Sequence, residues 1–238
     1  MAGRRPEDAV RWPVSLQGWR CLTFLHWPYP AEAVQRLLPD AVEVDAFDGT
    51  AWVSLTPFLM TGVRLGPLPP LGPLSTFPET NVRTYVRGPD GRDGLWFLSL
   101  EADCLPTVVG ASAVYGLPYR WAEMSVERGD VVRYRSRRRR AGDGGRRPGH
   151  DVLVRPGRER EPSALEDWLT GRWRAYTTVA RRLAVVGVEH QPWPLHDVDV
   201  VGLEQSLVEA AGLPAPEGDP LAGWSPGVHV RLGRPRPV

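Results

Sequence analysis

The chain has 238 residues, a hydrophobic fraction of 42% and a formal net charge of +1, which excludes a strong overall field that would attract nucleic acid or a membrane surface. A chain of this length buries a sizeable core without disulfides or metals, and Cys21 and Cys104 form neither a disulfide framework nor a CxxC pair. The sequence contains no apolar stretch of about 20 residues and no signal-peptide-like region, so we expect a cytoplasmic protein with no membrane partner.

Short elements separated by turns are expected, because the chain contains 25 prolines and 25 glycines. In chain order, apolar periodicity and turn residues predict a helix at 28–38, strands at 42–46 and 50–58, a loop at 62–73, strands at 81–86 and 95–100, a helix at 108–115, strands at 120–127, 131–137 and 151–154, a helix at 163–169, one or two strands within 173–188, a strand at 198–201, a helix at 204–211 and a strand at 228–232. Ser163 and Glu166 fit a capping box for the third helix. The pattern favours a barrel or curved sheet in one domain.

All 29 basic residues are arginines, and the chain contains no lysine. A side-chain Schiff base is therefore excluded, and only the α-amine of Met1 remains for that chemistry. Isoleucine is also missing and Asn81 is the only asparagine, so GC-rich codon usage explains the composition without a functional cause. If mutational bias removed the other asparagines, the one that remains, Asn81, becomes a position of interest.

The densest polar run of the chain lies at the start of an expected strand. Glu79, Asn81 and Arg83 share one face of that strand, because side chains alternate with a period of two. A carboxylate, an amide and a guanidinium in line suit the binding of a small polar ligand and a proton acceptor. On the pattern alone, a solvated strand face or a Glu–Arg pair across a sheet is the preferred interpretation, and the lone asparagine shifts the balance slightly toward function.

Segments spread along the chain carry a family resemblance. They are FLHWP at 24–28, LLP at 37–39, FDGTAWV at 47–53, FPETNVRTYV at 77–86, GLPY at 116–119, HQPWPL at 190–195 and SPGV at 225–228. Together they resemble the uncharacterised DUF2071 family, also called YqjF-like proteins. The resemblance extends over most of the chain from about Trp19, so we expect residues 1–18 to be an N-terminal extension and 19–238 to be a single domain.

The DUF2071 family is in turn similar to acetoacetate decarboxylases. This similarity implies an α+β, mainly β fold: a curved antiparallel β-barrel with a central cavity and a few short helices. The arginine ahead of the decarboxylases' first strand matches Arg20, and a cavity glutamate matches Glu79. Their second cavity glutamate is lost here, near Val53 or Ser54. Their two adjacent lysines are replaced by Tyr119 and Arg120, so the resemblance implies the cavity without the Schiff-base mechanism.

Non-covalent chemistry remains open to such a cavity. We expect Arg20 to anchor an anion, Glu79 to act as acid/base and Tyr119 to donate a hydrogen bond to a developing oxyanion. The remaining expected ligand contacts are Asn81, Arg83, Arg120, His26 and His190. Two functions stay open: a lyase-like or isomerase-like enzyme for a small oxo-acid or related carboxylate, using no cofactor, and a protein that only binds or senses such a carboxylate.

Other patterns are less specific. His26 and His190 also fit structural histidines, and the scattered histidines lack metal-ligand spacing, so we expect no metal. The arginine-rich hairpin at 133–147 is a rival site for a polyanion. Because every cation here must be arginine, a solvated hairpin with no nucleic-acid partner is the preferred interpretation. Assembly with copies of the same chain stays open.

Overall fold

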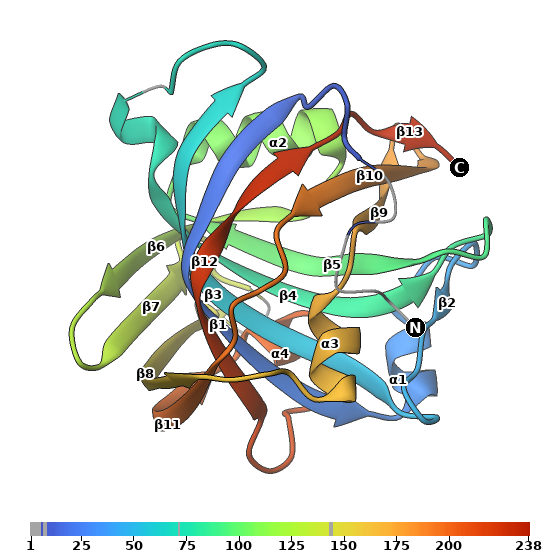
Figure 1. Ribbon diagram of the computed structural model, residues 1–238. Helices are drawn as coiled ribbons and strands as arrows, with labels where there is room; N and C mark the ends of the chain where they lie inside the picture. Colours follow the sequence, from blue (N-terminus) through green and yellow to red (C-terminus); the bar gives the residue numbers. More distant parts are fainter. Residues whose placement is uncertain (1–5, 7–8, 71, 143–144) are drawn as a thin grey trace.

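The computed structural model describes residues 6, 9–70, 72–142 and 145–238 of the chain (Figure 1). Met1, other parts of the expected N-terminal extension, Leu71 and residues 143–144 of the arginine-rich hairpin lie outside the described residues. The strands are β1 (Ser15–Tyr29), β2 (Glu43–Val44), β3 (Ala51–Leu65), β4 (Phe77–Arg87), β5 (Asp93–Ala102), β6 (Tyr119–Glu127), β7 (Val132–Arg138), β8 (Gly149–Glu159), β9 (Arg174–Val179), β10 (Arg182–His190), β11 (His196–Gln205), β12 (Leu221–Leu232) and β13 (Arg236–Pro237). The helices are α1 (Ala31–Gln35), α2 (Leu105–Tyr115), α3 (Ala164–Thr170) and α4 (Leu207–Ala210), with a 3-10 turn η1 (Gly72–Ser75).

The mainly β architecture with short helices confirms the predicted fold class, but several boundaries differ. The helix expected at 28–38 is limited to α1, because β1 continues to Tyr29 before the helix begins. The helix expected at 204–211 is reduced to α4, because the pairing of β11 with β8 continues to Gln205. The region 173–188 contains two strands, and Ala180 and Arg181 turn the chain between them with positive φ angles.

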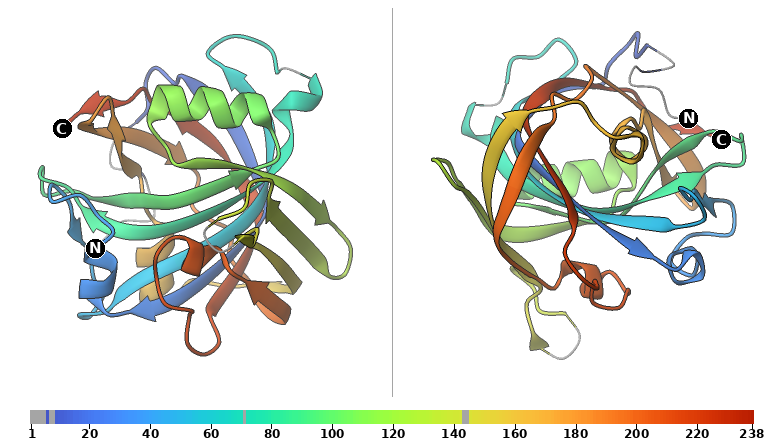
Figure 2. Two further views of the ribbon diagram at one scale, coloured as in Figure 1. Left: turned by 180° about the vertical axis from the view of Figure 1, so that it is seen from behind. Right: turned by 60° about the horizontal axis from the view of Figure 1, so that its bottom comes forward.

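The described strands form one sheet that closes on itself. Its order is β13-β10-β9-β5-β6-β7-β8-β11-β12-β1-β3-β4-β2. Two additional pairings, β10–β12 and β4–β5, join strands that are not neighbours in this order and so close the sheet (Figure 2). We call the closed path β1, β3, β4, β5, β9, β10 and β12 the first ring. The second ring leaves β5 through β6, β7, β8 and β11 and returns to β12. The strands shared by the rings therefore have an enclosed face on each side.

Strand β4 shows how one strand contributes to both rings. Every side chain from 79 to 86 is buried, so the solvated-face interpretation does not hold. Successive side chains point to opposite faces. Thr80 enters the second ring, where its hydroxyl lies 2.8 Å from Nε2 of His150. The opposite face enters the first ring, and it carries Glu79, Asn81 and Arg83 as the period-two pattern predicts.

The interiors of the two rings differ in chemistry. The second ring is filled largely by aliphatic side chains, including those of Leu25, Val53, Leu55, Val82, Val132, Val152 and Val154. The first ring instead encloses aromatic rings together with charged and polar groups, among them Phe24, His26, Phe58, Glu79, Arg83 and His190. Because buried ionisable groups are costly unless they serve a purpose, the first ring is the better candidate for a functional site.

The helices pack against the rings. α3 begins at the predicted capping box: Ser163 Oγ accepts from the Glu166 amide, and Glu166 accepts from the Ser163 amide at 2.9 Å. It places Trp168 against Tyr85, with ring centroids 5.0 Å apart. α2 lies beside β5, β6 and β9 (Figure 2). In the part of the chain that the structure describes, no helix has both the length and the apolar character needed to cross a membrane.

Candidate functional site

Glu79 and Tyr119 meet inside the first ring. Glu79 lies near the start of β4, Tyr119 is the first residue of β6, and β5 runs between them. The register pairs Glu79 with Ala102 and Tyr119 with Leu100, so both polar side chains share one face of the sheet. The Tyr119 hydroxyl donates a hydrogen bond to a Glu79 carboxylate oxygen at 3.2 Å. The structure thus brings together two residues that the sequence predicts to act together.

Burial sets the protonation of this pair. Glu79 is 2% exposed, and burial raises the pKa of its carboxyl to about 8. The hydrogen bond from Tyr119 opposes this rise, and the charge of Glu101 adds a smaller contribution to it. Burial and the neighbouring Glu79 raise the pKa of the Tyr119 phenol well above its usual value. At neutral pH, Glu79 is therefore mainly a neutral acid and Tyr119 a neutral hydrogen-bond donor.

Arg83 is a buried cation on the same face of β4. It is 5% exposed, and it forms no ion pair with any residue that the structure describes. Its guanidinium lies 5.6 Å from the centroid of Phe24, and its Nε has no hydrogen-bond partner. Burial lowers the pKa of Arg83, but a guanidinium stays charged at physiological pH. An unpaired buried charge is unfavourable, so this position suits an anion that enters the ring.

Two unpaired polar groups lie along the same row. Asn81 stands between Glu79 and Arg83 on β4, and Thr56 is its cross-strand neighbour on β3. Asn81 Oδ1 and Thr56 Oγ1 are buried without a hydrogen-bond partner in the described chain. Since nearly all buried polar groups in folded proteins are paired, this row is suited to a polar ligand or to water.

His26 lies beside this row and has partners of its own. Its Nδ1 is 2.6 Å from Ser54 Oγ and 3.3 Å from the Tyr85 hydroxyl. Burial, followed by the charge of Arg83, lowers the pKa of His26 to about 3. The ring is therefore neutral at physiological pH, and its contacts position Tyr85.

His190 lies in an aromatic enclosure. Its centroid is 4.6 Å from that of Trp173, 4.9 Å from that of Trp193 and 6.0 Å from that of Trp19. Nδ1 is 2.6 Å from the backbone oxygen of Gln191, which identifies this nitrogen as the donor. Burial lowers the pKa of His190 to about 4. A neutral imidazole among indoles makes an apolar wall with a single polar atom.

Arg20 does not belong to this cluster. Across β3, Arg20 is paired with Leu59, whereas Glu79 is paired with Phe58. Phe58 and Leu59 are successive residues and point to opposite faces, so the pleat directs Arg20 away from the interior of the first ring. The Arg20 guanidinium instead lies 2.7 Å from Nε2 of His229. The anion anchor expected at Arg20 is therefore not beside Glu79, and the buried arginine on the Glu79 face of β4 is Arg83.

Arg120 also faces away from the cluster. It follows Tyr119 on β6, so it points to the opposite face, and its neighbour on β5 is Glu101. Glu101 is fully buried and accepts from Nε and Nη2 of Arg138 at 2.9 and 2.6 Å. This second buried carboxylate is compensated outside the first ring. No motif in the sequence marks Glu101, because its strand position resembles those of its apolar neighbours.

Tyr115 is a site residue that the sequence analysis did not assign. It ends α2, is 8% exposed, and its hydroxyl is buried without a hydrogen-bond partner among the described residues. It is close enough to Tyr119 to act on that phenol electrostatically. The GLPY motif draws attention to Tyr119, and the turn of α2 adds a second phenol that the motif leaves unmarked.

Several arginines of the hairpin at 133–147 are engaged within the chain. Arg133 binds Asp151 at 2.5 Å, and Arg135 lies 3.2 Å from Glu127. Arg139 lies over the ring of Trp121, 4.6 Å from its centroid. These contacts reduce the charge that this hairpin offers to a polyanion.

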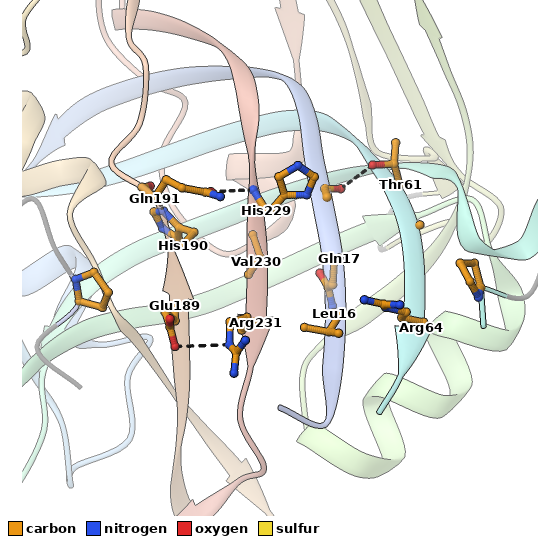
Figure 3. A pocket seen from close by; sticks show the side chains of 14 residues that line it. Leu16, Gln17, Thr61, Arg64, Glu189, His190, Gln191, His229, Val230 and Arg231 are labelled. Atoms are coloured by element: carbon orange, nitrogen blue, oxygen red, sulfur yellow. Dashed lines mark hydrogen bonds and ion pairs between the residues drawn. The ribbon is translucent and has the colours of Figure 1, made fainter. Parts of the chain in front are cut away.

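The described residues contain no group of three or more His, Cys, Asp or Glu side chains placed to hold a metal ion. Pockets of about 610 and 630 Å³ lie outside the Glu79 cluster, the first of them shown in Figure 3. The cluster itself offers a neutral acid, two phenols, an amide and the guanidinium of Arg83.

Comparisons with known proteins identify relatives across most of the chain. The DUF2071 family model, described as an uncharacterized conserved protein (COG2071), matches residues 16–229. The protein YqjF of Bacillus subtilis (strain 168) is 35% identical over 210 residues, which cover 88% of this chain and 86% of YqjF.

Solved structures show the same fold at low sequence identity. Acetoacetate decarboxylase from Legionella pneumophila matches with a TM-score of 0.64 and 13% identity, over 98% of this chain and 91% of that one. The enduracididine biosynthesis enzyme MppR, complexed with pyruvate, matches with a TM-score of 0.65 and 17% identity, over 97% and 93% of the two chains. These likenesses confirm the acetoacetate-decarboxylase-like fold predicted from the sequence.

Proposed function

Since the chain belongs to the DUF2071 family and has the fold of acetoacetate decarboxylases, we propose that it is an enzyme that moves a proton next to the carbonyl of a small oxo-acid or related carboxylate, without a Schiff base. The observation that carries the proposal is the uncompensated guanidinium of Arg83, buried on the same strand face as the neutral carboxyl of Glu79. One group is suited to an anion and the other to a proton transfer.

In this proposal, the ligand lies along the polar row of β4. Its carboxylate binds Arg83, where a charge-assisted hydrogen bond in a water-poor interior is strong. Asn81 and Thr56 offer the unpaired polar atoms that contact the middle of the ligand. On an extended strand the Cα atoms of Glu79 and Arg83 are about 13 Å apart, a separation that their side chains and a small ligand together bridge.

The proton transfer follows from the protonation of Glu79. When the C–C bond between the ligand's carboxylate and the carbon beside its carbonyl breaks, CO2 leaves, the electron pair moves toward the carbonyl oxygen, and neutral Glu79 supplies a proton to that oxygen. When a C–H bond beside the carbonyl breaks instead, its proton passes to water and the same proton transfer from Glu79 completes the enol. Tyr119, whose hydroxyl already points at Glu79, donates a hydrogen bond to the same developing charge. Such acid catalysis typically contributes about 10²–10⁴-fold in rate.

A second function, binding or sensing of a carboxylate without turnover, is favoured by a different observation. Glu101, the other buried carboxylate near Glu79, faces the opposite side of the sheet and is bound to Arg138. The row on β4 thus offers only Glu79 as a carboxyl for acid/base chemistry. Its groups for binding a carboxylate, Arg83, Asn81 and Thr56, do not depend on a second carboxyl.

Ligand binding and turnover, measured separately, test both functions. We would titrate acetoacetate, pyruvate and octanoate by calorimetry into the unmodified protein, Arg83→Met and Arg120→Met, which serves as a matched control on the outer face. Arg83→Met should weaken binding of the preferred carboxylate at least about tenfold, since it removes a charged hydrogen bond, and Arg120→Met should not. NMR of the reaction mixture then detects turnover, which Glu79→Gln should slow about 100-fold or more.

The outcomes separate the two functions. Binding with turnover lost in Glu79→Gln supports the enzyme, and binding without turnover supports the sensor. Equal losses in Arg83→Met and Arg120→Met, or no binding of any of the three carboxylates, would contradict both. Borohydride treatment in the presence of acetoacetate should leave the mass of residues 2–238 unchanged, because they contain no lysine.

A further inference from the structure

A hollow of about 610 Å³ lies across β3, β1, β12 and β10, away from the Glu79 cluster (Figure 3). The register aligns Arg64 with Leu16, Leu16 with Arg231, and Arg231 with Glu189, so these side chains form one row on one face of the sheet. His229, between the buried Val228 and Val230, points to the same outer face. We call this site the outer groove and define it by Leu16, Gly18, Thr61, Arg64, His229 and Arg231.

Gly18 makes the floor of the outer groove low. Its cross-strand neighbours are Thr61 and His229. A Cβ at Gly18 would lie 2.5 Å from Thr61 Oγ1 and 3.6 Å from Nε of Arg20. The Arg20 side chain therefore lies back over Gly18 and ends beside His229, 2.7 Å from its Nε2. Arg20, which the pleat excludes from the first ring, reaches the edge of the outer groove.

The outer groove has more positive charge than its own carboxylate neutralises. Arg231 is engaged, because it lies 3.6 Å from Glu189 and donates to the backbone oxygen of Val10 at 2.8 Å. Arg20 and Arg64 form no ion pair with any residue in the described chain. Figure 3 shows Arg64 extending from β3 toward Leu16 on β1. Two guanidinium groups thus lie at the outer groove without a carboxylate partner among the described residues.

We propose that the outer groove binds the phosphoryl group of a small phosphorylated molecule. Guanidinium groups present planar donor pairs that match phosphate oxygens, and two uncompensated cations match a dianion. The Thr61 hydroxyl already donates to the Gly18 backbone oxygen at 3.1 Å, so the arginines are the phosphate donors, and Leu16 offers an apolar surface for the organic part of the ligand. The volume is within the range of small-molecule sites. This proposal is independent of the carboxylate function, because Arg83 and Glu79 take no part in it.

Phosphate titration with matched arginine variants tests the outer groove. Inorganic phosphate and phenyl phosphate would be titrated at a constant ionic strength of about 0.15 M, so that general screening does not change. Amide NMR signals of Gly18, Thr61 and His229 should shift and saturate. Arg20→Gln and Arg64→Gln should each weaken binding about tenfold, because each removes a charge-assisted contact.

Arg128→Gln is the control, since Arg128 is an exposed arginine in the connection between β6 and β7, and it should bind phosphate as the unmodified protein does. Shifts that do not saturate would overturn the proposal, as would an equal loss in Arg128→Gln or equal binding of benzoate at the same signals. A negative result here leaves carboxylate binding in the first ring intact, so the two proposals fail separately.

Discussion

Glu79 shows how the environment of a single residue decides its chemistry. A glutamate on a solvated strand would be ionised at neutral pH, but burial raises the pKa of this carboxyl to about 8. The same burial keeps the Tyr119 phenol protonated. The sequence identifies both residues through their motifs, yet their protonation depends on what surrounds them in three dimensions.

The raised pKa of Glu79 makes stability depend on pH. Above pH 4.5 the unfolded state releases this proton while the folded state keeps it up to about pH 8, so the contribution of Glu79 to stability falls as pH rises through this window. The amide of the Glu79→Gln variant cannot ionise, so this variant does not lose stability in that pH window. The free energy of unfolding of Glu79→Gln relative to the unmodified protein should therefore increase by about 1.4 kcal/mol per pH unit between these limits. Urea titrations from pH 5 to 9 measure it, and a constant difference across that range would show that Glu79 ionises normally.

We expect the buried charge of Arg83 to lower the free energy of unfolding and to strengthen the binding of a carboxylate. Because its buried charge has no counter-ion in the described chain, an apolar side chain of similar length should be tolerated better than the guanidinium. Arg83→Met should raise the free energy of unfolding by about 1–3 kcal/mol while it weakens carboxylate binding at least about tenfold. Denaturant unfolding checks the first effect, and Arg138→Met, which breaks the pair with buried Glu101, should lower stability in the same assay. A large loss of stability in Arg83→Met would identify Arg83 as a structural residue.

Among elements, α2 and the turn after it position the Tyr119 side of the site. Gly116 caps the C-terminus of α2 with a φ of +65°, and the chain then passes through Leu117 and Pro118 to the start of β6. A Cβ at Gly116 would lie 2.0 Å from the Thr178 backbone oxygen. The helix therefore needs glycine here for its conformation and for its close approach to β9.

Two glycines of this segment should respond oppositely to alanine. Gly116→Ala should lower the free energy of unfolding by about 2 kcal/mol or more, because both the left-handed backbone and the contact with β9 oppose a Cβ. Gly110→Ala, within α2, should raise it by about 0.5–1 kcal/mol, since its Cβ meets nothing within 4 Å and alanine favours helix. Guanidinium titrations of both variants measure the difference. Equal effects would mean that the α2–β9 contact does not constrain Gly116.

At the element scale, local signals predicted turns and caps better than lengths. The capping box of α3 is present because it needs only neighbouring residues. The first helix was expected too long, because the sequence does not show that β1 continues to Tyr29 through its pairing with β3 and β12. Where both faces of a strand are buried, as in β4, apolar alternation disappears and only polar alternation remains.

At the scale of the whole molecule, the shared strands couple the two rings. β1, β3, β4, β5 and β12 each contribute side chains to both interiors, so opening one ring exposes part of the other. The coupling also links Glu79 in the first ring to Glu101, which faces Arg138 on the other side of the sheet.

This sharing predicts a common unfolding unit. β8 belongs to the second ring only, and β10 belongs to the first ring only. The protected amides of both strands should exchange with about the same free energy of opening. Native-state hydrogen exchange in rising denaturant checks this, with amides of β4 as the reference for global unfolding. If β8 exchanges well below β4 while β10 does not, the second ring opens by itself and the shared strands do not couple them.

The sequence by itself determined the fold class, the alignment of Glu79, Asn81 and Arg83 on one strand face, and the exclusion of a lysine Schiff base. These follow from composition, family motifs and period-two geometry, which need no distant contact. Only the tertiary structure decided that Arg20 and Arg120 face away, that Arg83 is buried on the Glu79 face, and that burial raises the pKa of Glu79. The reason is that a period of two defines two faces without saying which is enclosed, and enclosure depends on pairings such as β5–β9 and β10–β12 between segments far apart in the chain.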